Sequence, residues 1–151
     1  MSRAPLKLVD TSPGKESGYR LDSQVGFLLR KANQRHLSIF AQHIADLTPP
    51  QFAALAKLAE AGDTSQNQLG QMVAMDAATI KGVIDRLKTR GLVALTEHGS
   101  DRRRLVVSLT PAGRATIETL LTEAGAITAE TLAPLTAREA ATLARLLGKI
   151  G

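Results

Sequence analysis

The chain has no cysteine and no tryptophan, and only 3% of its 151 residues are aromatic. Without cysteine it can form no disulfide, no thiolate metal site and no thiol-based peroxide sensor. No apolar run approaches the roughly 20 residues that a membrane span needs. The N-terminal residues lack the apolar stretch of a signal peptide. We therefore expect a cytoplasmic protein with no membrane partner, whose core is built from Leu, Ile, Val and Ala.

Positive charge is not spread evenly along the chain. The net charge is +5, from 19 basic and 14 acidic residues. Between positions 76 and 114, eight basic residues stand against four acidic ones, whereas beyond position 114 three basic residues stand against four acidic ones. This concentration indicates a surface that binds a polyanion.

The spacing of apolar residues predicts helices over most of the chain, with one interruption. Each predicted helix after the first is preceded by a residue whose side chain can cap a helix N-terminus. These residues are Thr48, Ser65, Asp76, Thr110 and Thr136. In the interruption, Leu105, Val107 and Leu109 alternate with Arg104, Val106 and Ser108, which is typical of a strand with one buried face. Residues 92–97 supply a partner strand, and residues 98–101 supply the turn.

These elements predict a mostly α fold with a small β-hairpin wing, a winged helix–turn–helix flanked by N- and C-terminal dimerisation helices. We expect a mobile N-terminal arm at 1–20 and a first dimerisation helix of about 25 residues within 21–47. The DNA-binding domain would occupy 48–113, and the C-terminal dimerisation helices 114–151. A short helix beside a cationic hairpin is an arrangement that binds duplex DNA.

The segment from Ser65 to Gly113 also resembles the MarR family of bacterial transcription regulators. The resemblance rests on Asp76, Thr79, Asp85, Arg86, Leu87, Gly91, Leu92, Asp101, Arg102, Arg103, Leu109, Thr110 and Gly113. It implies a sequence-specific regulator, most often a dimeric repressor that a small ligand releases from DNA. It implies no cofactor.

The predicted recognition helix follows Asp76. Its apolar face (Ile80, Val83, Ile84 and Leu87) would pack on the domain and leave its N-terminal face for base edges. The predicted DNA contacts of this helix are Ala77, Ala78, Thr79, Lys81 and Arg86. Lys81 could donate to guanine, and Arg86 is placed for a phosphate or for Asp101. The alternative for both is a solvated helix face.

The wing carries Asp101 and three consecutive arginines, Arg102, Arg103 and Arg104. An arginine at a narrow hairpin tip suits the minor groove, where narrowing deepens the negative potential. By resemblance, Arg103 is the minor-groove residue, Asp101 orients it or caps the turn, and Arg102 and Arg104 contact phosphates. The alternative is a hairpin whose charges only aid solubility.

Two further surfaces follow from helix positions. Ser65, Gln66 and Gln68, at the start of a short helix, can donate to phosphates, although Ser65 and Gln68 also fit a capping box. The C-terminal stripe of Leu143, Leu146, Leu147 and Ile150 has little chain left to cover it. We expect a second copy to bury it, so that the homodimer reads a pseudo-palindromic operator in double-stranded DNA.

Effector binding is implied by the resemblance, since family members bind small aromatic ligands near the dimer helices. The candidate residues are Arg35, His36, Phe40 and His43, which could hold an aromatic acid or its coenzyme A thioester. Alternatively, the histidines are ordinary polar or interface residues. His36 and His43 lie about 10 Å apart along a helix, too far to grip one metal ion easily.

Other classes of protein fit the sequence less well. An enzyme would need a nucleophile motif, a phosphate-binding loop or clustered acids, and none is present. A winged helix that serves only as a protein adaptor would not need the arginine-tipped hairpin. The remaining alternative is a constitutive or metal-responsive DNA-binding regulator without an organic effector.

Overall fold

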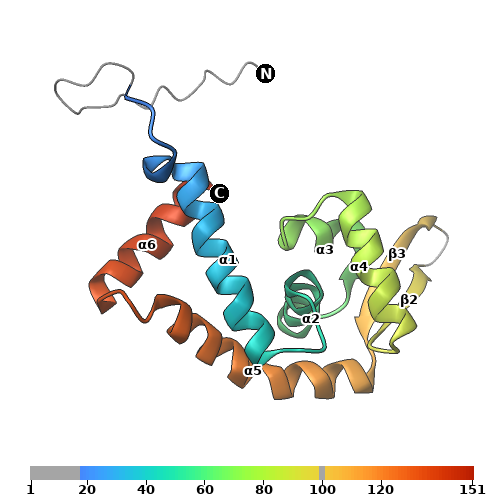
Figure 1. Ribbon diagram of the computed structural model, residues 1–151. Helices are drawn as coiled ribbons and strands as arrows, with labels where there is room; N and C mark the ends of the chain where they lie inside the picture. The colour runs from blue at the N-terminus through green and yellow to red at the C-terminus, as the bar shows by residue number, and fades with distance from the viewer. Residues whose placement is uncertain (1–17, 99–100) are drawn as a thin grey trace. The chain divides into compact units, whose positions relative to one another are not determined.

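The computed structural model describes residues 18–98 and 101–151, and it divides the chain into two compact units, residues 1–35 and 36–151. The first unit holds η1 (Leu21–Ser23) and the first part of α1 (Val25–His43). The second unit holds the rest of α1 and all later elements (Figure 1). These are α2 (Pro49–Ala61), β1 (Thr64–Ser65), α3 (Gln66–Met72), α4 (Ala77–Thr89), β2 (Val93–His98), β3 (Asp101–Leu109), α5 (Pro111–Leu132) and α6 (Ala137–Ile150).

Helix α1 is shorter than the predicted helix at 21–47. Before it, the Ser23 hydroxyl and the Gln24 amide both donate to the carbonyl of Arg20, at 3.1 and 3.0 Å. Side-chain bonds of this kind compete with helical ones, and Gln24 has an extended backbone. At the other end, α1 stops at His43, and Leu47 is buried in the connection to α2. The prediction was therefore too long at both ends. Residues 1–17 of the predicted arm lie outside the described residues.

The predicted helix starts are confirmed. Thr48 with Gln51 and Thr136 with Glu139 form reciprocal capping boxes at α2 and α6. Ser65 caps α3 by accepting from the Gln68 N–H at 3.2 Å. The Gln68 side chain does not return the bond but accepts from the Thr64 hydroxyl.

The sheet has three antiparallel strands in the order β1–β3–β2, so the described strands include one more than the predicted hairpin. β2 pairs with β3 from Val93 opposite Leu109 onward, and β1 places Thr64 opposite Val107 on the other edge of β3. The two residues of β1 are too few to show a period in the sequence. Val107 is completely buried, which anchors the sheet to the helices.

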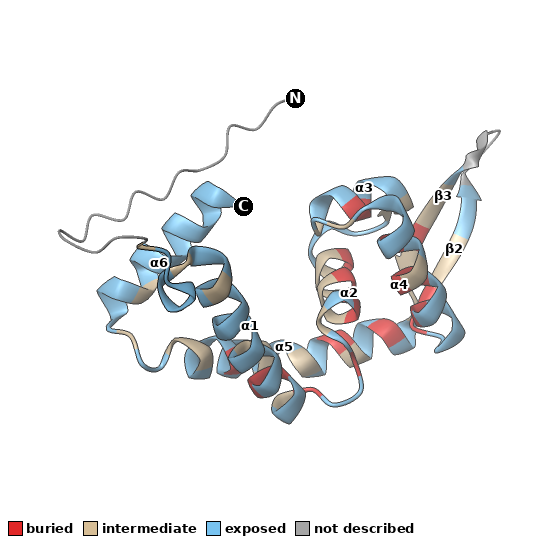
Figure 2. Cartoon of the chain, turned by 45° about the horizontal axis from the view of Figure 1, so that its top comes forward, coloured by how far each residue is buried: buried red, intermediate tan, exposed pale blue. Residues whose placement is uncertain are grey.

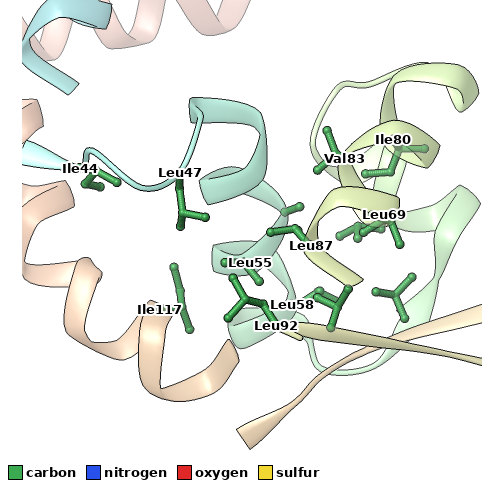
Figure 3. Close-up of a cluster of buried hydrophobic side chains, with 14 of the residues drawn as sticks. Ile44, Leu47, Leu55, Leu58, Leu69, Ile80, Val83, Leu87, Leu92 and Ile117 are labelled. Carbon is green, nitrogen blue, oxygen red and sulfur yellow. The ribbon is translucent and has the colours of Figure 1, made fainter. Parts of the chain in front are cut away.

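One hydrophobic core holds the second unit together. The largest side chains that are less than 2% exposed are Leu55, Leu58, Leu69, Ile80, Ile84, Leu87, Val107 and Ile117. Figure 3 labels six of them, Leu55, Leu58, Leu69, Ile80, Leu87 and Ile117. Near the end of α1, Phe40 packs edge-to-face on Phe52 of α2, with ring centroids 5.9 Å apart. Buried residues gather in the end of α1, the α1–α2 connection, α2–α4, the sheet and part of α5, whereas α6 has none (Figure 2). The mostly helical fold with a small sheet is as predicted. Within the described ranges, no helix is long and apolar enough to cross a bilayer.

Candidate nucleic-acid interface

Helix α4 presents its first turn to solvent and buries its opposite face. Ile80, Ile84 and Leu87 lie in the core, whereas Ala77, Ala78, Thr79 and Lys81 are exposed. Asp76 fixes the start of the helix, because its carboxylate accepts from the Thr79 N–H at 2.7 Å. That backbone hydrogen bond lowers the pKa of Asp76 below its ordinary value. The predicted reading face is therefore free to meet DNA.

The turn between α3 and α4 brings the two helices very close. A Cβ on Gly70 would lie 3.1 Å from both the Ile80 side chain and the Met75 carbonyl oxygen. Met75 N–H donates to the Gly70 carbonyl at 2.8 Å, and Ala74 takes a positive φ of 56°. A positive φ is unusual for alanine, so the packing of the two helices imposes it. This turn geometry could not be predicted from the sequence.

The two long cations of α4 have different surroundings. The Lys81 ammonium pairs with Asp85 one turn later at 2.8 Å, with both side chains more than half exposed. An exposed ion pair of this kind contributes little to the free energy of folding. Lys81 can therefore leave Asp85 and bind a DNA base with little loss of free energy. The Arg86 guanidinium lies over Gly82, since a Cβ there would be 3.6 Å from Nη1.

The β2–β3 hairpin lies beside α4 at one end of the second unit (Figure 1). Arg104 is exposed on β3. Residues 99–100 and the side chains of Asp101, Arg102 and Arg103 lie outside what the structure describes. The predicted minor-groove contact of Arg103 therefore stays a prediction.

The base of the wing is joined tightly to α5. Thr110 N–H donates to the Leu92 carbonyl at 3.1 Å, its hydroxyl donates to Gly91 O at 2.6 Å, and the same hydroxyl accepts from Gly113 N–H at 3.0 Å. A Cβ on Gly113 would lie 1.9 Å from the Leu92 carbonyl oxygen. The Leu109, Thr110 and Gly113 pattern that the sequence singled out is thus the joint that fixes the wing's orientation.

The predicted phosphate contacts of α3 have competing roles. Ser65 and Gln66 are half-buried, and Gln68 is exposed. Ser65 serves as the cap of α3, and Gln68 bonds to Thr64. Contact of these three residues with DNA stays a prediction.

A cleft of about 600 Å³ opens in the second unit between the α1–α2 connection and α5. Its lining residues are His43, Ile44, Ala45, Asp46, Leu47, Arg90, Ala115, Thr116, Thr119 and Leu120. The mixture of apolar side chains and a few polar groups suits a small organic ligand. The sequence did not indicate this set, because its members come from three separate segments with no shared motif.

His43 is held by two carboxylates of α5. Its Nδ1 lies 2.9 Å from Glu123 and its Nε2 lies 2.7 Å from Glu130. Both partners are acceptors, so the arrangement favours an imidazolium with a proton on each nitrogen. The hydrogen bond to Glu130, then that to Glu123, raises the pKa of His43 above its ordinary value of 6.5.

Of the four residues predicted for an effector, only His43 lines the cleft. His36 Nδ1 lies 2.9 Å from the Thr131 hydroxyl, and Phe40 is buried in the core against Phe52. Arg35 belongs to the first unit. In residues 18–98 and 101–151, no group of three or more His, Asp or Glu side chains could hold a metal ion.

The exposed second helix of a helix–turn–helix, beside a β-hairpin joined to the core, defines a winged-helix DNA-binding protein. The model of the MarR family matches residues 45–104. NicR of Pseudomonas putida, an HTH-type transcriptional repressor, is 40% identical over 99% of this chain and 90% of its own length. The chain belongs to the MarR family, and it is a transcriptional regulator rather than an enzyme.

Solved structures agree with this assignment. A probable transcriptional regulator from Pseudomonas aeruginosa is 53% identical, with a TM-score of 0.84 over 87% of this chain and 100% of its own. BpsR of Bordetella bronchiseptica is 42% identical, with a TM-score of 0.83 over 87% of this chain and 96% of its own. The DNA binding of BpsR is regulated by 6-hydroxynicotinic acid.

Proposed function

We propose that the chain is a cytoplasmic, homodimeric repressor that binds a pseudo-palindromic operator and is released by a small aromatic acid. The observation that carries the proposal is a cleft for an organic ligand in the same unit as an exposed reading helix. Two similar proteins support it, since NicR is a repressor and BpsR responds to 6-hydroxynicotinic acid.

On DNA, the first turn of α4 enters the major groove and the wing reaches the adjacent minor groove. Lys81 leaves Asp85 to donate to a base edge, and Ala77, Ala78 and Thr79 allow close approach. Arg103 enters the minor groove, and Arg86, Arg102 and Arg104 contact phosphates together with the start of α3. The lysine and arginine side chains among these contacts carry one positive charge each, so affinity for DNA falls steeply as salt rises.

Dimerisation supplies the twofold symmetry that an operator of this kind needs. Leu143, Leu146, Leu147 and Ile150 of α6 are between 36% and 69% exposed, although their spacing places them on one helix face. A second copy of α6, with the first dimerisation helix, covers this stripe.

The effector is an aromatic or heteroaromatic acid small enough for the cleft, such as 6-hydroxynicotinic acid. Leu47 and Leu120 offer apolar contact to a ring, and the Arg90 guanidinium at the cleft attracts its carboxylate. The DNA binding of BpsR is regulated by a free acid, so we propose the free acid rather than its coenzyme A thioester.

The test is a fluorescence anisotropy titration on an operator selected from random duplex DNA. The wild-type protein should bind at nanomolar concentration and dissociate when a hydroxylated pyridine or benzene carboxylic acid is added. Arg103→Ala should weaken binding by roughly tenfold while the dimer persists. Binding that no aromatic acid alters would favour the constitutive regulator instead.

A further inference from the structure

Arg90, the C-cap residue of α4, lines the cleft. It directly follows Thr89, the last residue of α4, and keeps a helical backbone with φ −80° and ψ −3°. Its N–H donates to the Arg86 carbonyl at 3.2 Å. Arg90 therefore moves with the recognition helix.

The Arg90 side chain also bonds to the α1–α2 connection, which lines the cleft. Its Nη1 donates to the carbonyl of Asp46 in the α1–α2 connection, a residue 44 positions away. A guanidinium has five N–H donors, so this bond leaves donors for a further partner.

The charge of Arg90 is not neutralised by the described part of the protein. No carboxylate among the described residues lies within ion-pair distance of it. His43, the other cationic group at the cleft, has two glutamates as partners. Of the two cationic side chains at the cleft, His43 is already paired with two carboxylates, whereas Arg90 is paired with none among the described residues. An anion that enters the cleft is therefore expected to bind Arg90.

Arg90 borders a second hollow as well. This hollow, of about 390 Å³, is lined by Gln51, Asp85, Arg86, Thr89 and Arg90, and so runs along the C-terminal half of α4. Arg90 thus lines both the cleft and the hollow beside α4, the helix that carries Lys81. A ligand that moves it acts on α4 without a chain of intermediate contacts.

We propose that Arg90 is the positioning residue that couples effector to operator: the effector carboxylate takes its guanidinium in place of the Asp46 carbonyl. This inference rests on the proposed function. A carboxylate can accept two parallel N–H bonds from one guanidinium, whereas the Asp46 carbonyl accepts one. The exchange releases α4 from the α1–α2 connection, and the reading helix leaves its DNA-binding position.

The coupling must act in both directions. If the effector weakens operator binding by a given factor, the operator weakens effector binding by the same factor. A ligand shifts the two states only by its difference in affinity for them. If Arg90 cannot bind the effector carboxylate, the effector should weaken operator binding less, and the operator should weaken effector binding less by the same factor.

The experiment compares wild type with Arg90→Lys and Arg90→Gln, and with Lys88→Gln as the matched control. Lys88 is exposed on the same turn of α4 and lines neither hollow. Lysine keeps the charge and a donor for Asp46 but cannot bind a carboxylate through two parallel bonds. Operator binding is measured by anisotropy with and without 6-hydroxynicotinic acid, and folding by circular dichroism.

We expect release of Arg90→Lys, measured relative to its own operator affinity, to need roughly tenfold more acid than release of wild type, the loss of one charge-assisted hydrogen bond. Lys88→Gln should be released as wild type is. With wild-type protein, 6-hydroxynicotinamide, which lacks the carboxylate, should release operator at least roughly tenfold less well than the acid. This arm needs no variant to fold.

Release of Arg90→Lys and Arg90→Gln at the wild-type acid concentration would overturn the inference and leave the proposed function standing. Equal release of wild type by the acid and the amide would also overturn it. A wild-type protein that no aromatic acid releases would instead remove the proposed function, and this inference with it.

Discussion

Gly113 meets a steric requirement that no other residue can satisfy. The position of its Cβ is 1.9 Å from the Leu92 carbonyl oxygen, which belongs to the backbone and cannot rotate away. Gly113→Ala should lower the free energy of unfolding by ~3 kcal/mol, at the upper end of overpacking effects. Urea denaturation measures the change.

Gly125 provides the matched control on the same helix. A Cβ there meets nothing within 4 Å. Gly125→Ala should therefore stabilise α5, by about 0.5–1 kcal/mol, through the lower entropy of the unfolded chain. Equal effects of the two substitutions would contradict the close contact at Gly113.

The contacts of His43 with Glu123 and Glu130 make the stability of the protein depend on pH, and the direction of that dependence can be predicted. The hydrogen bonds to Glu130 and Glu123 raise the pKa of His43 above 6.5, so its stabilisation is fully present below pH 6.5. It is lost as the pH rises through the pKa of the folded state. His43→Gln should remove this decline, which melting temperatures measured from pH 5.5 to pH 9 would show. Parallel curves for wild type and variant would rule out these contacts of His43.

Among the elements, the recognition helix depends on its cap. Asp76 accepts from the Thr79 N–H at 2.7 Å, next to the residues expected to meet DNA. Asp76→Ala should fray that turn and weaken operator binding by up to about fivefold. Asp76→Asn keeps the acceptor and should bind close to wild type. Anisotropy titrations of the two variants separate loss of the cap from loss of charge, and equal weakening would point to charge.

Helices that show several repeats of apolar spacing, or a capping residue at their start, could be predicted from the sequence. The starts of α2, α4, α5 and α6 follow from Thr48, Asp76, Thr110 and Thr136, because capping is local chemistry. Two-residue β1 could not be predicted, since its partner lies more than 40 residues along the chain. The first helix was predicted too long, because apolar spacing alone does not register the side-chain bonds to Arg20.

The candidate sites divide in the same way. The reading face of α4 and the joint at Gly113 follow from patterns within one segment. The cleft does not, because Asp46, Arg90 and Thr116 become neighbours only after folding. Phe40 looked suitable for a ligand, yet an aromatic residue at helical spacing equally fits the core, where the structure places it.

At the scale of the whole molecule, the proposed homodimer depends on the apolar stripe of α6. Leu146→Glu would put a charge on the exposed apolar stripe and should yield monomers, because an interface does not readily bury an unpaired carboxylate. Arg145→Glu, at the adjacent position, is the control and should remain dimeric. Light scattering distinguishes the two.

Truncation after Pro134 should likewise give monomers or aggregates, and a clean dimer from it would exclude α6 from the interface.

Helix α5 runs unbroken for 22 residues from the base of the wing toward α6. At 1.5 Å per residue its axis is about 33 Å long. A tilt of only about 5° at one end therefore displaces the other by about 3 Å, close to the 3.4 Å step between neighbouring base pairs. A tilt of α5 too small to disturb the hydrophobic core can therefore displace the wing by about one base pair along the DNA.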